Sequence, residues 1–134
     1  MNAPSYDIYT MLEDSSSGVN LTLGTNLFVG SEPSLPKNCV TIFDTAGYPS
    51  YLSVKGEVGY EYPSVQIRVR NSNYINGWNL INNIKDALHG KHWETWNDAL
   101  YTIIACVSGP ALLDWDDNNN CRFVITLNMQ RRSA

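Results

Sequence analysis

Apolar and polar residues alternate strictly over residues 65–70, and this is the clearest pattern in the chain. Period-two alternation predicts a strand with one buried face, to which Val65, Ile67 and Val69 belong. Residues 121–129 alternate in the same way and predict a second strand with one apolar face.

Residues 100–107 predict a third strand. The segment 114–120 separates it from the strand at 121–129 and consists mainly of Asp and Asn, which favour turns. We therefore expect these two strands to form an antiparallel hairpin.

A helical period replaces the alternation between residues 74 and 88, where large apolar residues recur every three or four positions. Asn71, Ser72 and Asn73 stand before this stretch, and their side-chain oxygens are suited to accept the unpaired N–H groups of a first turn. Gly90 stands where a helix C-cap belongs. The pattern predicts one well-defined helix.

The first half of the chain is less regular. Residues 5–15 predict a helix, 26–30 a short strand, and 39–43 a strand that is buried on both faces. A loop with two prolines is expected over 30–38.

Residues 44–63 predict no firm structure, because they contain three glycines and two prolines. We expect an extended arm of about 45–63. It is either an irregular loop folded back on its own domain, or a hairpin in which 51–54 pairs with 60–62. Tyrosine-rich loops are favoured at protein interfaces. The arm is therefore a candidate interface through Tyr48, Tyr51, Tyr60 and Tyr62.

These elements predict an α/β (α+β) fold in a single domain over 1–134. The expected architecture is a single mixed, mostly antiparallel sheet with about two helices packed on one face, plus the long loop or hairpin arm. A length of 134 residues is typical of one domain.

Charge and cysteine content narrow the function classes. A formal net charge of -4 disfavours free, non-specific nucleic-acid binding. We expect no membrane span and no signal peptide, because no apolar run approaches 18 residues. Cys39, Cys106 and Cys121 each lie in an apolar segment, which favours free thiols in a reducing compartment, the cytoplasm in which the chain is made.

The motif Asp44-Thr-Ala-Gly47 follows an apolar strand, as the magnesium and γ-phosphate contact of small GTPases does. Such proteins also need a G-x-x-x-x-G-K-[ST] loop to hold the phosphates. The chain has one Gly-Lys pair, Gly90-Lys91, and His92 follows it where a hydroxyl is required. We interpret the motif as a strand that ends in a turn.

Two other groups resemble metal sites. His89 and His92 are three residues apart, but the glycine between them is expected to end the helix. A histidine at a helix C-terminus more often makes a favourable contact with the helix dipole than it binds a metal. Residues 114–120 alternate oxygen-bearing side chains like a calcium loop. However, Asn119 occupies the glycine position of such a loop, and Ile125 that of its bidentate glutamate. We expect no metal site.

Catalytic chemistry is not indicated either. Ser108-Gly-Pro lacks the glycine spacing of a nucleophile elbow, and the three thiols have no predicted basic partner. We expect no catalytic residues, no cofactor and no enzymatic activity.

The predicted sheet carries a polar stripe on the face opposite its apolar residues. It is either a solvated face, or a surface that faces a partner or nucleic acid passing nearby without base-specific contact. Its residues are Gln66, Arg68 and Arg70, joined on a neighbouring strand by Arg122, Thr126 and Asn128.

An ordered set of segments extends from residue 5 to residue 132. Its parts are Leu27-Phe-Val-Gly-Ser-Glu-Pro, Pro36-Lys-Asn-Cys-Val-Thr-Ile-Phe-Asp-Thr-Ala-Gly-Tyr-Pro, Tyr62-Pro-Ser-Val-Gln-Ile-Arg-Val-Arg, Ile84-Lys-Asp-Ala-Leu-His-Gly, Ile104-Ala-Cys-Val-Ser-Gly-Pro, the acidic turn and Met129-Gln-Arg-Arg. This order resembles the tailed-bacteriophage minor capsid or tail terminator (tail completion) protein family.

The resemblance implies a structural virion protein of the tail or neck. Similar proteins form a ring, usually of six copies, on the head-proximal end of the tail tube. Such a ring ends tube polymerisation and offers a docking surface to the head–tail connector. The implied partners are further copies of the chain, the tail tube protein and a connector or neck protein, with genomic DNA close by in the lumen and no membrane.

The alternatives are a head-side minor capsid or neck adaptor protein and, second, a monomeric protein-binding adaptor. In the ring, Gln66, Arg68, Arg70 and Arg122 are expected to face the lumen or a ring partner, and the tyrosines to reach a neighbour. Reversal of Arg68 and Arg70 to glutamate is then expected to impair assembly and leave the fold intact.

Overall fold

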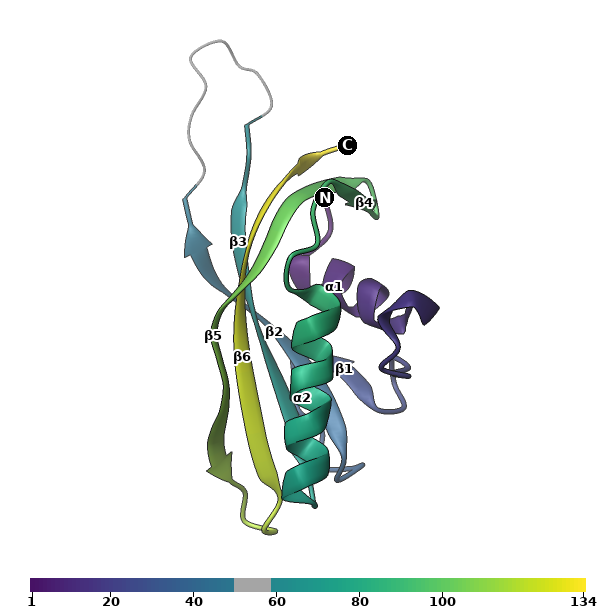
Figure 1. The fold of residues 1–134 in the computed structure, drawn as a ribbon, viewed down its shortest axis with the longest axis vertical. Helices are drawn as coiled ribbons and strands as arrows, with labels where there is room; N and C mark the ends of the chain where they lie inside the picture. The colour runs from purple at the N-terminus through teal and green to yellow at the C-terminus, as the bar shows by residue number, and fades with distance from the viewer. Residues whose placement is uncertain (50–58) are drawn as a thin grey trace.

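The computed structural model describes residues 1–49 and 59–134, which form one mixed sheet with two α-helices on one face (Figure 1). In chain order the elements are α1 (Pro4–Glu13), the short 3-10 helix η1 (Ser15–Ser17), β1 (Leu27–Val29), β2 (Cys39–Tyr48), β3 (Tyr62–Asn71), α2 (Tyr74–Leu88), β4 (Glu94–Trp96), β5 (Ala99–Trp115) and β6 (Cys121–Ser133).

The sheet order is β1-β2-β3-β6-β5-β4. β1 runs parallel to β2, and every other pair is antiparallel. The predicted fold class, with a mixed and mostly antiparallel sheet and two helices on one face, is confirmed.

The register of the strands aligns residues across five of the six strands. One such row consists of apolar residues. From β1 to β5 it contains Leu27, Val40, Val69, Phe123 and Leu112.

The core lies between this sheet and the helices. Val65, Ile67 and Val69 are fully buried, as the alternation predicts. Opposite them α2 buries Ile81 and Ile84, which lie one helical turn apart. The apolar faces that the helical and the strand periods predict therefore pack against each other in one core.

Both ends of α2 follow the sequence prediction. The Asn73 side chain accepts the Asn76 N–H at 3.0 Å, which caps the first turn. The helix ends at Leu88, and Gly90 has a φ of 88°, a backbone conformation that favours glycine. No helix of the described residues is long and apolar enough to cross a membrane.

Four strands are longer than predicted. β5 continues to Trp115 rather than ending at residue 107, and β2 continues from residue 43 to Tyr48. β3 begins at Tyr62 rather than at residue 65, and β6 continues from residue 129 to Ser133. Thr45 pairs with Ser64, and Tyr48 pairs with Tyr62 beyond a bulge, so both ends of the predicted arm of 45–63 are strand. Pairing with β3 extends β2, because the residues Thr-Ala-Gly-Tyr do not themselves alternate between apolar and polar. The predicted pairing of 51–54 falls outside the described residues.

Candidate functional site

The polar stripe lies on the sheet face away from the helices. In the β3–β6 ladder, Gln66 pairs with Thr126 and Arg70 with Arg122, which confirms that the stripe crosses both strands. Directly paired residues of antiparallel strands project from the same face. The four proposed stripe residues Gln66, Arg68, Arg70 and Arg122 therefore belong to one surface.

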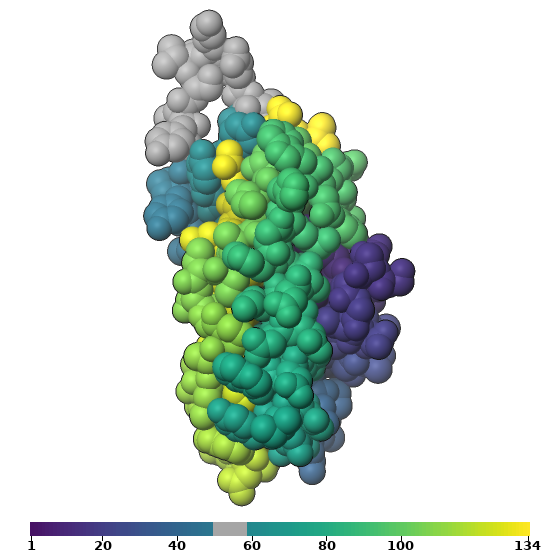
Figure 2. Space-filling view, in the orientation of Figure 1, coloured from purple at the N-terminus to yellow at the C-terminus, as the bar shows by residue number. Residues whose placement is uncertain are grey.

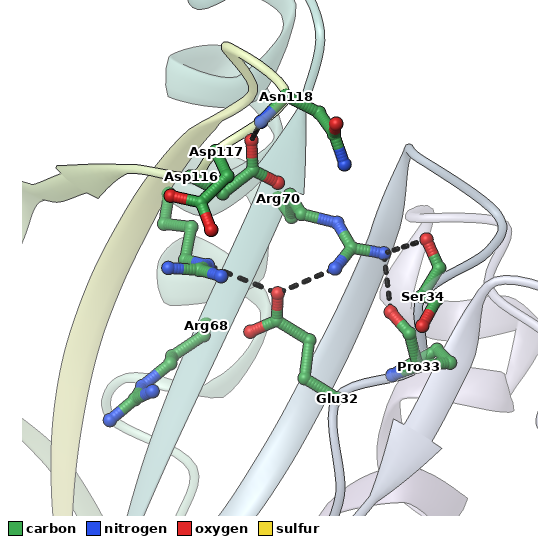
Figure 3. A pocket seen from close by; sticks show the side chains of 9 residues that line it. Glu32, Pro33, Ser34, Arg68, Arg70, Asp116, Asp117 and Asn118 are labelled. Carbon is green, nitrogen blue, oxygen red and sulfur yellow. Dashed lines mark hydrogen bonds and ion pairs between the residues drawn. The ribbon is translucent and has the colours of Figure 1, made fainter.

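Glu32 organises one end of this surface (Figure 3). Its Oε1 atom lies 2.7 Å from Arg70 Nη1 and 3.0 Å from Arg122 Nε. Arg122 Nη1 lies 3.1 Å from an oxygen of Asp114 on β5. Burial lowers the pKa of Arg122, but hydrogen bonds to Asp114 and Glu32 outweigh it and raise the pKa overall. Arg122 thus ties the loop before β2 to β5.

Arg70 is only 6% exposed, because the loop over 31–38 covers it. Besides Glu32, its guanidinium donates to the backbone carbonyls of Pro33 (2.6 Å), Pro36 (2.8 Å) and Lys37 (3.0 Å). A charged side chain with this many partners fixes the loop on the sheet. Arg70 acts within the chain, which its place in the alternating pattern does not reveal.

Arg68 differs from its two neighbours. Its Nε donates to Gln66 Oε1 at 2.8 Å, and its guanidinium carbon lies 4.9 Å from the centre of the Phe43 ring. Over residues 1–49 and 59–134, no carboxylate pairs with Arg68. It lines a polar depression together with Glu32, Pro33, Ser34, Arg70, Asp116, Asp117, Asn118 and Arg122 (Figure 3). Arg68 is the arginine of the stripe whose charge remains available.

The Asp-Thr-Ala-Gly motif has a structural role. Asp44 accepts hydrogen bonds from the backbone N–H and the hydroxyl of Ser5, at 2.9 and 2.6 Å. Ala3, the N-cap residue of α1, makes no side-chain cap, so a carboxylate from β2 stabilises that helix end. The motif lies within β2 and does not end it, so the predicted turn is wrong.

The two groups that resemble metal sites make local hydrogen bonds. His89 Nδ1 accepts the N–H of Cys106 at 2.9 Å. Asp116 accepts the N–H groups of Asn118 and Asn120, at 2.9 and 2.8 Å, and hydrogen bonds of this kind hold the pKa of Asp116 below its usual value. No group of three His, Cys, Asp or Glu in the described part of the chain is arranged to hold a metal ion.

The cysteines are free thiols, and Cys39 and Cys121 are buried. Burial raises the pKa of both thiols. Since the thiolate is the reactive form, these two groups are poor nucleophiles at neutral pH.

Three of the four candidate tyrosines lie in the described residues, and Tyr51 falls outside them. Tyr48 is exposed and pairs with the half-buried Tyr62 across β2 and β3. The Arg132 guanidinium carbon lies 5.9 Å from the centre of the Tyr60 ring. These tyrosines surround the base of the arm.

A buried ionic cluster, which the sequence does not predict, lies beside them. Arg131 Nη1 lies 3.2 Å from Asp7 Oδ2, and Arg131 Nε lies 3.0 Å from Glu61 Oε2. The Tyr101 hydroxyl also donates to Asp7, and burial together with this hydrogen bond raises the pKa of Tyr101. Residues from α1, β5, β6 and the arm base meet here, and because Asp7 and Arg131 are 124 positions apart, no local pattern could reveal the cluster.

Comparison with known proteins agrees with this architecture. A protein family described as "Bacteriophage tail terminator protein" matches residues 6–132. Among solved structures, a chain of "Virion of native gene transfer agent (GTA) particle" has a similar fold, with a TM-score of 0.64, 12% sequence identity, and coverage of 98% of this chain and 96% of that chain. None of the curated proteins matches. Because the family match spans nearly all of the sequence, the chain belongs to the bacteriophage tail terminator family, a family of structural proteins of the virion tail.

Proposed function

We propose that copies of this chain form a ring, six in number, at the head-proximal end of the tail tube. The ring ends tube polymerisation and offers the surface on which the head–tail connector docks. The observation that carries this proposal is the family match over residues 6–132. The structure supports it with a rigid sheet whose helix-free face is polar and open around Arg68.

Within this ring, Gln66 and Arg68 face the lumen or the next copy. Arg70 and Arg122 shape the same surface by holding the loop over 31–38 in place. Among the arginines of the stripe, Arg68 alone lacks a carboxylate partner in the described part of the chain, and on a chain with a net charge of -4 this suits DNA that passes without being held tightly. The tyrosines Tyr48, Tyr51, Tyr60 and Tyr62 are proposed contacts to a neighbouring copy or to the tube.

Electron microscopy of particles assembled without this chain tests the proposal. Overlong tubes that are separate from filled heads are expected, and wild-type chain supplied in trans should restore tubes of uniform length. Tubes of normal length beside unjoined heads would instead assign the chain to the head side of the neck.

A further inference from the structure

An exposed hydrophobic patch lies where the N-terminal end of α2 meets the far end of β5. Its members are Tyr74, Trp78, Leu112 and Trp115, which are 38–52% exposed. The Tyr74 and Trp115 rings are stacked, with 6.3 Å between their centres. The surfaces of α2 and β5 adjoin on the face that Figure 2 shows.

The patch is held in place from below by Phe123. Tyr74 and Trp78 pack edge-on against the Phe123 ring, at centre distances of 5.0 and 5.8 Å, and Leu112 pairs with Phe123 across the β5–β6 ladder. Phe123 itself is fully buried. The exposed rings are therefore fixed by the core, and an apolar surface with this rigidity is typical of a protein interface.

The opposite edge of the sheet carries a shallow depression. It is lined by Tyr6 of α1, by Leu23 and Gly24 before β1, and by Phe28, Val29 and Ser31. Leu23 is 39% exposed and contributes an aliphatic wall. The depression lies at β1, the first strand of the sheet order, and the patch lies on β5, which β4 covers only at residues 99–101, so that β5 is itself the edge of the sheet at Leu112. In Figure 2 α1 and the far end of β5 lie on opposite sides of the molecule.

The strand register places these surfaces at the same height. The apolar row that begins at Leu27 on β1 ends at Leu112 in the patch. A contact that joins the β5 edge of one copy to the β1 edge of the next needs no displacement along the strands. A head-to-tail contact without such a rise closes into a ring rather than growing into a helix.

We propose that the patch of Tyr74, Trp78, Leu112 and Trp115 docks into the depression around Leu23 and Phe28 of a second copy of this chain. This inference rests on the proposed ring and assigns its joint: the two edges of the sheet, one from each neighbour. The interface is heterologous, so each copy uses both edges at once.

Cross-linking in assembled particles tests the joint. A chain carrying both Leu112→Cys and Leu23→Cys is supplied to assembling particles, which are then treated with a short bis-maleimide. A denaturing gel should show a ladder of covalent multimers that ends at the size of the ring. Each single variant should give no ladder beyond the wild-type background, which reports the native thiols. A matched control combines Leu112→Cys with Trp93→Cys, since Trp93 is an exposed ring outside both surfaces, and it should give no ladder.

The outcomes separate this inference from the proposed function. Particles that contain the chain in several copies, but give no ladder with the double variant, would overturn the joint and leave the ring standing. Dimers from Leu112→Cys alone would show that the patch pairs with itself, which also overturns the joint. A chain that is absent from particles, or present once, would overturn the ring and the joint together.

Charge variants give an independent measurement. Leu112→Asp or Leu23→Asp places a carboxylate in a desolvated contact, and the yield of tailed particles should fall roughly tenfold or more. Trp93→Asp should assemble like the wild type. Normal yields from both edge variants would contradict the proposed joint.

Discussion

The Asp44 carboxylate holds Ser5 through two hydrogen bonds, and this contact attaches the first turn of α1 to β2. Replacement by alanine should lower the free energy of unfolding by about 1 kcal/mol, because a helix cap is lost. Urea unfolding monitored by circular dichroism measures it, with the exposed Asp86→Ala as control. Unchanged stability, together with a rise in Tm on addition of GTP and Mg²⁺, would show that the motif contacts a nucleotide.

Glu32→Gln should lower the free energy of unfolding by about 3 kcal/mol, because it leaves the buried Arg70 without its counter-charge. Asp114→Asn removes the more exposed partner of Arg122 and should cost at most about 1 kcal/mol. The denaturant concentration at the midpoint of unfolding measures both changes, provided that the unfolding free energy falls with denaturant at the same slope in each variant. Equal losses in the two variants would contradict the structural role of the loop over 31–38.

The sequence alone predicts the same outcome for reversal of Arg68 and of Arg70, whereas the structure distinguishes them. Arg68→Glu should preserve the thermal unfolding midpoint and reduce assembly. Arg70→Glu should lower the midpoint, because it places a negative charge beside the Glu32 carboxylate and four backbone carbonyl oxygens. Measuring Tm and particle yield for each variant tests this. Normal assembly of Arg68→Glu would remove Arg68 from the interface.

Gly77→Ala should destabilise the protein, although alanine favours helices by about 1 kcal/mol. A Cβ atom at residue 77 would lie 2.8 Å from Phe123 Cε2 and 3.1 Å from Asn71 Cβ, so the core must shift. We expect a net loss of about 1–2 kcal/mol in urea unfolding. The exposed Asn79→Ala on the same helix should be neutral or stabilising, and a stabilised Gly77→Ala would show that Phe123 moves freely.

Acid should loosen the turn between β5 and β6 only below the usual carboxyl range. Hydrogen bonds, first of all the one from the Asn120 N–H, hold the pKa of Asp116 in the folded chain below its usual value of 3.8. Its stabilising contribution is therefore complete above pH 3.8 and is lost as the pH falls through the lower folded value. Carboxyl NMR shifts of Asp116 and the amide signals of Asn118 and Asn120 report the midpoint. A midpoint at or above 3.8, or the same titration of these amides in Asp116→Asn, would contradict this prediction.

Local periodicity predicts the elements that bury a regular face. Val65, Ile67 and Val69 follow a period of two, and Ile81 and Ile84 follow the helical period, so core and helix are predicted correctly. Tyr74 and Trp78 share that helical period but are exposed, because α2 extends past the edge of the core over Phe123.

Contacts between distant residues are not predictable in this way. Glu32 lies in the loop between β1 and β2, and no local sequence pattern indicates that it pairs with Arg70 and Arg122. The extension of β5 follows from its pairing with β6, whereas its own sequence includes Gly109 and Pro110, which argue against a strand. Strand pairing and ion pairs between distant residues therefore determine which side chains the candidate surface exposes.

Hydrogen bonds hold both ends of the chain in place, and the one at the N-terminal end comes from Arg131 of the buried cluster. Arg131 Nη1 donates to the Asn2 carbonyl at 2.9 Å, and the N–H of Ala134 donates to the Asp98 carbonyl at 3.0 Å. N- and C-terminus thus lie at one end of the sheet, and the turn between β5 and β6 lies at the other (Figure 1). A peptide tag on either terminus would mark the same pole of the subunit, so labelled particles would reveal which pole points toward the head.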